Sequence, residues 1–410
     1  RSVPSASESM PGGDAAREDT PVAGGSAVAE ASAALPSAAP ENETAASALP
    51  FADLVQNLER ALDCKGKNSH EKKCRVLFSP ALAEATIVKK QSPFPIVRLV
   101  LPDVDNSRAN YNIKQQTLAT VYGKLLGLNK ESDAMKRLQN WRKQTTSVVV
   151  GNFANVLHDV LSKREGAATK PCDKTIGYVN ALLDELSQAQ GQEQQERIFS
   201  TMLTEFNALE QKWLVRIIIK DMKLGVGHGG VLKFLHDKGE QAFNTCCDLR
   251  KVCEALCYPD QLSTFVNKIS LHSPFTPMLS HGVKRHLGQV LPAMGQNPFV
   301  MDIKLDGERM LCHKQGDVVR FFTRRANEYT ASYGPVMKDV ILRTVNLDNA
   351  ILDGEMCSYD HVQRKLVPFG SNRTVADEEK KAATEGGESS GRQLFYIVFD
   401  ILLAGGPRAT

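Results

Sequence analysis

The sequence predicts a multidomain protein in which an all-α domain is followed by an α+β domain with antiparallel sheets. Between residues 51 and 270, apolar side chains recur at three- and four-residue spacing, as in helices. After Pro274 the pattern changes to short runs rich in Val, Ile, Phe and Tyr, as in strands. Residues 1–50 are rich in Ala, Ser and Pro and contain no aromatic residue, so we expect a disordered tail. We place the boundary between the two domains near Leu271, so that the second domain covers residues 271–410.

Composition and charge limit the class of protein. The chain has 410 residues, of which 42% are hydrophobic and 24% charged, which excludes a wholly disordered or collagen-like protein. No run of 18 apolar residues is present, so we expect no membrane association. Residues 1–50 carry a net charge of −5, which leaves +8 for residues 51–410, so the folded part is the basic part. Nine cysteines without matched Cys-x-x-Cys pairs indicate a reduced compartment, the cytosol or nucleus.

The clearest helical pattern covers residues 204–224, where apolar side chains alternate with charged ones and predict an amphipathic helix. A glycine-rich turn follows at residues 225–230, and a second helical pattern begins at Val231. The first backbone N–H groups of that second helix, beside Lys220 and Lys223, could bind a phosphate. The alternative is a helix–turn–helix corner with solvated lysines, because glycine-rich turns are common.

Beyond Pro274 we expect strands, one helix and one surface insertion. The helix covers residues 335–345. Residues 376–393 are rich in Glu, Lys, Gly and Ser, which predicts a low-complexity insertion in a loop. The expected strands cover residues 299–304, 309–314, 318–323, 350–359 and 394–403.

The stretch from Asp302 to Met310 (Asp-Ile-Lys-Leu-Asp-Gly-Glu-Arg-Met) carries the most information about chemistry. Lys304 at the end of a strand, followed by an Asp-Gly turn, places an amine in a tight loop that a ligand can approach closely. A lysine amine is ordinarily protonated. The charge of Arg309, a metal ion or burial would each favour the free base, which attacks phosphorus or carbonyl carbon. The alternative is a hairpin turn with surface charge.

This stretch resembles the active-site motif of ATP-dependent DNA ligases, within the covalent nucleotidyltransferase superfamily. Four further stretches occur in the order and at the distances of that family. Upstream, residues 209–226 resemble the helical DNA-binding domain of ligases of the ligase IV type, and the whole resemblance covers residues 51–403. The four stretches are residues 275–279 (Phe-Thr-Pro-Met-Leu), 322–324 (Phe-Thr-Arg), 351–356 (Ile-Leu-Asp-Gly-Glu-Met) and 396–400 (Tyr-Ile-Val-Phe-Asp).

The resemblance implies a role for each matching residue. Lys304 would attack the α-phosphate of ATP, release pyrophosphate and become lysyl-AMP. Arg309 would contact the nucleotide, Glu355 would lie near the ribose and hold Mg²⁺, and Phe399 would stack on adenine. Without the resemblance, Glu355 could be strand-end charge and Phe399 a core ring. The remaining ATP-binding positions would be Asp302, where the family often has Glu, Ile303 and Leu305.

The implied function is that of an ATP-dependent DNA ligase in the nucleus. It would join 3′-hydroxyl and 5′-phosphate ends during double-strand break repair by non-homologous end joining. Double-stranded DNA with nicks or ends would contact Lys220, Lys223 and Arg324. A scaffold repair protein would bind only through C-terminal BRCT repeats, which this sequence lacks. Because the sequence ends at Thr410, we expect the adenylation (nucleotidyltransferase) domain to be incomplete at its C-terminus.

Two alternatives to this function remain. The chain could be a truncated, non-catalytic DNA-binding fragment of such a ligase. It could also be an RNA ligase or an mRNA-capping guanylyltransferase, which share the Lys-x-Asp-Gly chemistry, although neither class explains the long helical region.

Other reactive side chains are expected to be structural. Four neighbouring cysteines could suggest zinc, but two of them lie four residues apart on one helical face and no closing His pair follows, so buried thiols are favoured. We expect His228 and His272 to be structural or solvated. The cysteines are Cys246, Cys247, Cys253 and Cys257.

Overall fold

The computed structural model describes residues 44–78, 90–108, 111–143, 151–164, 171–258, 262, 269–279, 288, 290–295, 298–368, 370–385 and 391–407. Most of the predicted tail, residues 1–43, lies outside the described residues. Within those ranges, no helix has both the length and the apolar character needed to cross a membrane.

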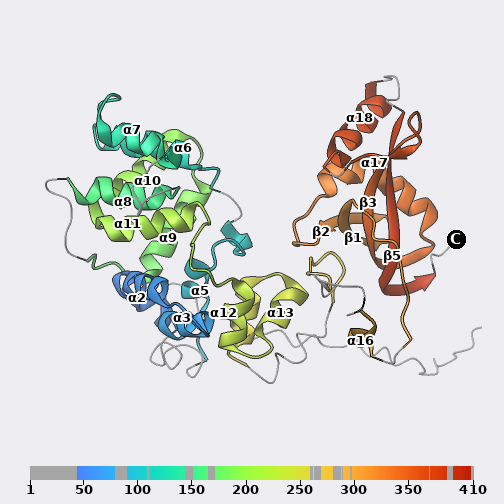
Figure 1. The fold of residues 1–410 in the computed structure, drawn as a ribbon, viewed down its shortest axis with the longest axis horizontal. Helices are drawn as coiled ribbons and strands as arrows, with labels where there is room; N and C mark the ends of the chain where they lie inside the picture. The colour runs from blue at the N-terminus through green and yellow to red at the C-terminus, as the bar shows by residue number, and fades with distance from the viewer. Residues whose placement is uncertain are drawn as a thin grey trace, which may run out of the picture. The chain divides into compact units, whose positions relative to one another are not determined.

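The first part of the described chain is helical, as the sequence predicts (Figure 1). Buried apolar side chains from most of these helices share one core, which includes Phe51, Leu118, Phe199 and Trp213. The helices are α1 (Ala45–Ala48), α2 (Phe51–Asp63), α3 (Ser69–Leu77), α5 (Phe94–Val100), η3 (Asn106–Arg108), α6 (Gln115–Leu125), α7 (Asp133–Gln139), η4 (Trp141–Lys143), α8 (Phe153–Ser162), α9 (Ile176–Gln188), α10 (Gln192–Glu205), α11 (Ala208–Ile218), α12 (His228–Leu235), α13 (Gly239–Cys246) and α14 (Leu249–Ala255). The short helix α16 (Val290–Met294) follows the predicted boundary near Leu271.

Among the described residues, ordered structure is already present from Thr44, before the predicted end of the tail at residue 50. The Thr44 hydroxyl oxygen caps α1 by accepting the backbone N–H of Ser47 at 3.2 Å. Ala46 is fully buried, and a Cβ placed on Gly177 of α9 would lie 3.2 Å from the Ser47 side chain. The small residues that suggest disorder in isolation therefore also permit close helix packing.

The single helix predicted over residues 204–224 is wrong, because two helices occupy this region. α10 ends at Glu205 and α11 begins at Ala208. The Asn207 side chain accepts the backbone N–H of Glu210 at 2.9 Å, and the Glu210 carboxylate accepts the backbone N–H of Asn207 at 2.8 Å. This capping box starts a new helix where the apolar spacing alone suggests continuity.

The amphipathic character expected of this segment is also wrong for α11, which is buried on nearly all sides. Its charged side chains find partners in the interior. One Glu59 carboxylate oxygen accepts both the Lys212 ammonium and the Trp213 indole N–H, each at 2.6 Å. The Arg216 guanidinium donates to the Met222 carbonyl oxygen at 3.0 Å. Pairing offsets the desolvation of these charges, so a helix with many charged residues can lie inside the domain.

The second part of the chain contains a five-stranded antiparallel sheet (Figure 1). Strand order is β2-β1-β3-β4, and β5 also pairs with β3. Helices α17 and α18 pack on one face, where Met310, Phe321 and Tyr333 belong to a shared core. The elements are β1 (Glu308–Gln315), β2 (Val318–Thr323), α17 (Thr330–Thr344), β3 (Leu347–Asp360), β4 (Lys365–Leu366), α18 (Asn372–Glu385) and β5 (Arg392–Pro407).

The opposite face of the sheet holds a fully buried histidine, His313 on β1. Its Nδ1 accepts the backbone N–H of His272 at 3.0 Å, and its ring packs against the rings of Phe275 and Phe322. Burial, followed by the neighbouring His272, lowers the pKa of His313 to about 4. The prediction that His272 is structural agrees with this contact.

Two sequence predictions in this part differ from the structure. Residues 299–304 form no strand, and Val300, Met301 and Ile303 are each more than 80% exposed, because no strand among the described residues pairs with them. The loop expected over residues 376–393 is helical as far as Glu385, since α18 buries Val375 and Ala376 against the sheet domain. Residues 386–390 lie outside the described residues.

Replacing Glu59 by Ala should destabilise the helical domain by about 2–4 kcal/mol, because Lys212 and the Trp213 indole would lose their shared acceptor in the interior. Urea unfolding followed by tryptophan fluorescence measures this loss. The matched control is Glu71→Ala, which removes a surface pair with Arg75 whose side chains are 51% and 70% exposed, and should cost less than about 0.5 kcal/mol. Equal losses in the two variants would contradict the interior role of Glu59.

The buried His313 should make the sheet domain less stable at low pH. Its folded pKa of about 4 lies below the ordinary 6.5, so its contribution is complete above pH 6.5 and is lost as the pH falls towards 4, by about 1.4 kcal/mol per pH unit. Between pH 7 and pH 5, wild type should therefore lose about 2 kcal/mol more than His313→Asn in urea unfolding monitored by circular dichroism. His361→Asn, which alters an exposed histidine, is the control and should behave as wild type.

Candidate active site

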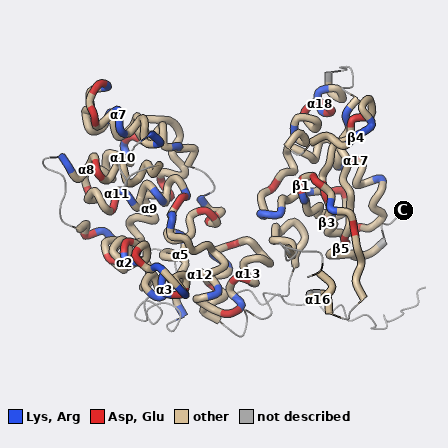
Figure 2. Tube along the Cα trace, viewed as in Figure 1, with Lys and Arg blue, Asp and Glu red and all other residues tan. Residues whose placement is uncertain are grey.

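Strands β1, β3 and β5 bring three of the predicted site residues together. Antiparallel pairing places Arg309 on β1 opposite Glu355 on β3, and Asp353 on β3 opposite Asp400 on β5. Asp353 and Glu355 are two residues apart on one strand, so both side chains belong to the same face of the sheet. The charges of Asp353, Glu355 and Asp400 all act on Arg309. Figure 2 shows both basic and acidic positions on this sheet.

The Arg309 guanidinium is held by Asp353 through two parallel hydrogen bonds. Nε donates to Oδ1 at 2.9 Å and Nη2 donates to Oδ2 at 2.6 Å. This pairing raises the pKa of Arg309 further, and the charges of Glu355 and Asp400 act in the same direction. The guanidinium carbon lies 5.5 Å from the centre of the Phe399 ring, within range of a cation–π contact.

Phe399 reaches this position because of a β-bulge. The register of β3 and β5 passes from Asp353 opposite Asp400 to Gly354 opposite Val398, which leaves Phe399 without a cross-strand partner. Bulges re-aim side chains in this way beside functional sites. A Cβ on Gly354 would lie 2.6 Å from the Ile397 carbonyl oxygen, so only glycine permits the strands to approach here. The Phe399 side chain is 47% exposed and available to a ligand, rather than in the core.

The predicted Asp-Gly turn supports Glu355 directly. The backbone N–H of Gly307 donates to the Glu355 carboxylate. Burial raises the pKa of Glu355, while the Gly307 N–H and the positive charges of Lys304 and Arg309 oppose the rise. A Cβ on Gly307 would lie 2.4 Å from the Met356 carbonyl oxygen and 2.9 Å from Glu355 Cγ, so this turn fits closely against β3.

Lys304 lies in the exposed segment that precedes this turn. Its ammonium donates to the Leu305 carbonyl oxygen at 3.2 Å, and its charge acts on Glu355. Two other predicted nucleotide-binding residues are exposed. The Asp302 carboxylate accepts the backbone N–H of Ile303 at 2.8 Å, which orders the segment locally. The structure thus places Arg309 beside Phe399, and places Glu355 within range of the charges of Arg309 and Lys304.

Asp353 is the residue of this site that sequence reasoning did not single out. It precedes Gly354 in the Ile-Leu-Asp-Gly-Glu-Met stretch, but nothing in the sequence shows that its partner is Arg309 on another strand. The signal in the sequence that could have identified Asp353 is its spacing from Glu355, because residues two apart on a strand share a face.

The three predicted DNA contacts have different surroundings. The Lys220 ammonium donates to the Arg108 carbonyl oxygen at 2.6 Å, and burial lowers its pKa, so this lysine is bonded within the helical domain and its contact with DNA stays a prediction. Lys223 is 59% exposed and pairs with Asp221 at 3.0 Å. Arg324 is exposed in the turn after β2, where Ala326 adopts a left-handed backbone with φ of 63°.

The four clustered cysteines and His228 lie against the protein interior. Cys247, Cys253 and Cys257 are buried, and the Cys257 thiol contacts the Cys253 carbonyl oxygen at 3.6 Å. The His228 ring packs 5.2 Å from the Phe243 ring. Over the described ranges, no three His, Cys, Asp or Glu side chains are grouped closely enough to hold a metal ion by themselves.

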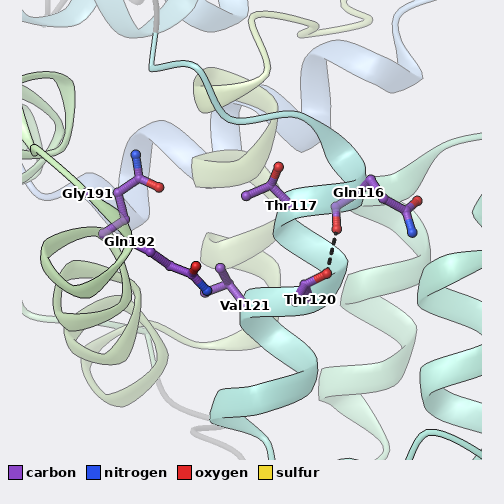
Figure 3. A pocket seen from close by; sticks show the side chains of 7 residues that line it. Gln116, Thr117, Thr120, Val121, Gly191 and Gln192 are labelled. Carbon is purple, nitrogen blue, oxygen red and sulfur yellow. Dashed lines mark hydrogen bonds between the residues drawn. The ribbon is translucent and has the colours of Figure 1, made fainter.

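A hollow of about 450 Å³ lies between α6 and α10 in the helical domain (Figure 3). Its lining consists of amides, hydroxyls and one aliphatic side chain, and Thr120 donates to the Gln116 carbonyl oxygen at 3.1 Å. Its lining contains no Asp, Glu, His, Lys, Cys or Tyr side chain that could act as a general acid or base. The lining residues are Gln116, Thr117, Thr120, Val121, Gly191, Gln192 and Gln195.

Comparison with protein families agrees with the resemblance described above. A model described as "DNA ligase N terminus" matches residues 46–236, and one described as "ATP dependent DNA ligase domain" matches residues 277–409. The chain belongs to the ATP-dependent DNA ligase family. The first match covers the helical domain from α2 to α12, and the second contains the whole five-stranded sheet.

Individual relatives of this ligase-family chain are DNA ligase 4 proteins. The Arabidopsis thaliana protein is 34% identical over 326 residues, which cover 78% of this chain and 26% of the relative. The Homo sapiens protein is 33% identical over 380 residues, which cover 88% of this chain and 40% of the relative. The Gallus gallus protein is 33% identical over 377 residues, with the same coverage of 88% and 40%. The chain therefore spans between a quarter and two fifths of the length of these relatives.

Replacing Gly307 by Ala should destabilise the sheet domain by about 1–3 kcal/mol and displace Glu355, since the new methyl group would overlap β3. Thermal unfolding monitored by circular dichroism measures the effect. Gly334→Ala is the control, because that glycine lies in α17 and its Cβ would meet a Thr330 methyl group at 3.3 Å. A Gly307→Ala melting temperature equal to that of wild type would show that the turn has room for a side chain.

Proposed function

We propose that the sheet domain transfers an adenylyl group from ATP to Lys304 as the first step of DNA joining. The observation that carries this proposal is the contact of Arg309 with Phe399, next to a Glu355 carboxylate on which the charges of Lys304 and Arg309 act, in a chain of the ATP-dependent ligase family. Each group has a distinct property: an amine, a cation, a carboxylate and a flat apolar ring. Together they match the parts of a nucleoside triphosphate.

In the proposed step, the unprotonated Lys304 Nζ attacks the α-phosphorus of ATP. A nitrogen–phosphorus bond forms, the bond from the α-phosphorus to the bridging oxygen breaks, and pyrophosphate leaves, while the second amine proton passes to solvent. Phe399 offers its exposed ring to the adenine base. Arg309 offers the N–H groups that Asp353 does not use to the phosphate oxygens, where negative charge increases.

Glu355 is the residue that would hold Mg²⁺ with ATP. Magnesium commonly binds through one or two carboxylates plus substrate phosphates, so a single carboxylate beside the loop suits it better than a closed protein cage. The bound ion would supply positive charge near the phosphates. The Glu355 carboxylate is already oriented by the hydrogen bond that it accepts from the Gly307 backbone N–H.

For the complete protein we propose joining of DNA 3′-hydroxyl and 5′-phosphate ends in double-strand break repair by non-homologous end joining in the nucleus. The DNA ligase 4 relatives support this function. Duplex DNA would contact exposed basic groups such as Lys223 and Arg324. A scaffold repair protein would bind the complete protein through BRCT repeats.

The test is transfer of label from α-labelled ATP to the purified chain in the presence of Mg²⁺, with the labelled residue located by mass spectrometry. We expect label on Lys304, its loss in Lys304→Ala, and its retention in Lys338→Ala, which removes an exposed lysine of α17. No label on the folded wild-type chain would favour a non-catalytic DNA-binding protein. Preferential transfer from GTP would instead indicate a guanylyltransferase.

A further inference from the structure

The side chain of Asp353 is almost wholly buried, with 4% of it exposed, whereas that of Arg309 is 23% exposed. Both carboxylate oxygens accept from the guanidinium. A buried carboxylate with a bidentate arginine partner is a fixed anchor, because leaving either charge unpaired in the interior would be costly. The pair therefore locates the guanidinium before any ligand binds.

Three carboxylates act on Arg309, yet only Asp353 has hydrogen bonds to it among the described contacts. Glu355 accepts the Gly307 N–H, and Asp400 accepts the backbone N–H of Ile401 at 2.8 Å. Glu355 and Asp400 thus contribute negative charge, while Asp353 sets the orientation of the Arg309 guanidinium. A guanidinium has five N–H groups, so two bonds to Asp353 leave three for another anion.

Phe399 also lies beside the arginine, with its ring centre 5.5 Å from the guanidinium carbon. Asp353 and Phe399 lie on paired strands whose register changes at this point. Without the Asp353 anchor, the long Arg309 side chain could rotate. Part of the free energy of nucleotide binding would then be spent in ordering it again.

We propose that Asp353 is a positioning residue, which fixes the Arg309 guanidinium beside Phe399 so that its free N–H groups face the phosphates of the nucleotide. This inference rests on the function proposed above. Asp353 itself does not touch the substrate and acts only through Arg309. Its loss should therefore impair the same step as loss of Arg309 and should add nothing further once Arg309 is absent.

The experiment measures the rate and the ATP dependence of lysyl-AMP formation in wild type, Asp353→Asn, Arg309→Ala and the double variant. We expect Asp353→Asn to lower kcat about 10- to 100-fold with a change in KM of less than about threefold, because the misplaced guanidinium is needed most in the transition state. The double variant should lie within about twofold of Arg309→Ala. Asp353→Glu, which keeps the charge, should recover part of the rate.

The matched control is Asp360→Asn, since Asp360 lies at the far end of β3 and pairs with Arg392 at 3.5 Å. It should keep the wild-type rate within about twofold. Circular dichroism on every variant separates lost rate from lost fold, and Asp353→Glu replaces Asp353→Asn in the cycle if the latter does not fold.

Two results would overturn the inference alone: a wild-type rate in Asp353→Asn, or a double variant whose loss is the product of the two single losses. The second result would mean that Asp353 has a general structural role. A folded wild-type chain that takes no label would instead overturn the proposed function, and this inference with it.

Discussion

The position of every chemical group at the site depends on the pairing of β3 with two strands at once. β1 supplies the arginine and the glycine turn precedes it, β3 supplies two carboxylates, and β5 supplies the aromatic ring. The Tyr396 hydroxyl lies 2.9 Å from the carbonyl oxygens of both Met310 and Leu352, so it ties β5 to the other two strands where the register changes. Gly354 makes this possible, because any side chain there would overlap the Tyr396 ring.

The helical domain is organised by buried charges in a similar way. The Arg98 side chain is 1% exposed and bonds to the Asp105 carboxylate at 2.9 Å. The Asp184 carboxylate also bonds to Arg98, and it bonds to Arg108 at 2.6 Å. The Glu59 pair with Lys212 follows the same principle. Many basic residues of this domain are therefore committed to its interior, and net charge overstates the number of cations available to a DNA phosphate.

The sequence predicted the ordered elements well where local signals and tertiary packing agree. β2 was expected over residues 318–323 and occupies them, because a Gln-Gly-Asp turn precedes a compact run of Val and Phe. The helix expected over residues 335–345 exists as α17 but begins at Thr330, so Pro335 lies inside the helix and not at its start, where proline is usually found. The strand predicted over residues 299–304 is absent, because an alternating apolar run becomes a strand only when another strand pairs with it.

The amino-acid order alone determined the class of each domain and the glycine turn at Gly307, because periodicity and short motifs are local properties. The resemblance of its ordered motifs to the ligase family made Lys304, Arg309, Glu355 and Phe399 candidates. Only the tertiary structure decided that Asp353 holds Arg309, that a bulge exposes Phe399, and that the Lys220 ammonium points into the protein. Those outcomes depend on strand register and on which backbone oxygen lies within reach. Both are set by contacts between residues far apart in the chain.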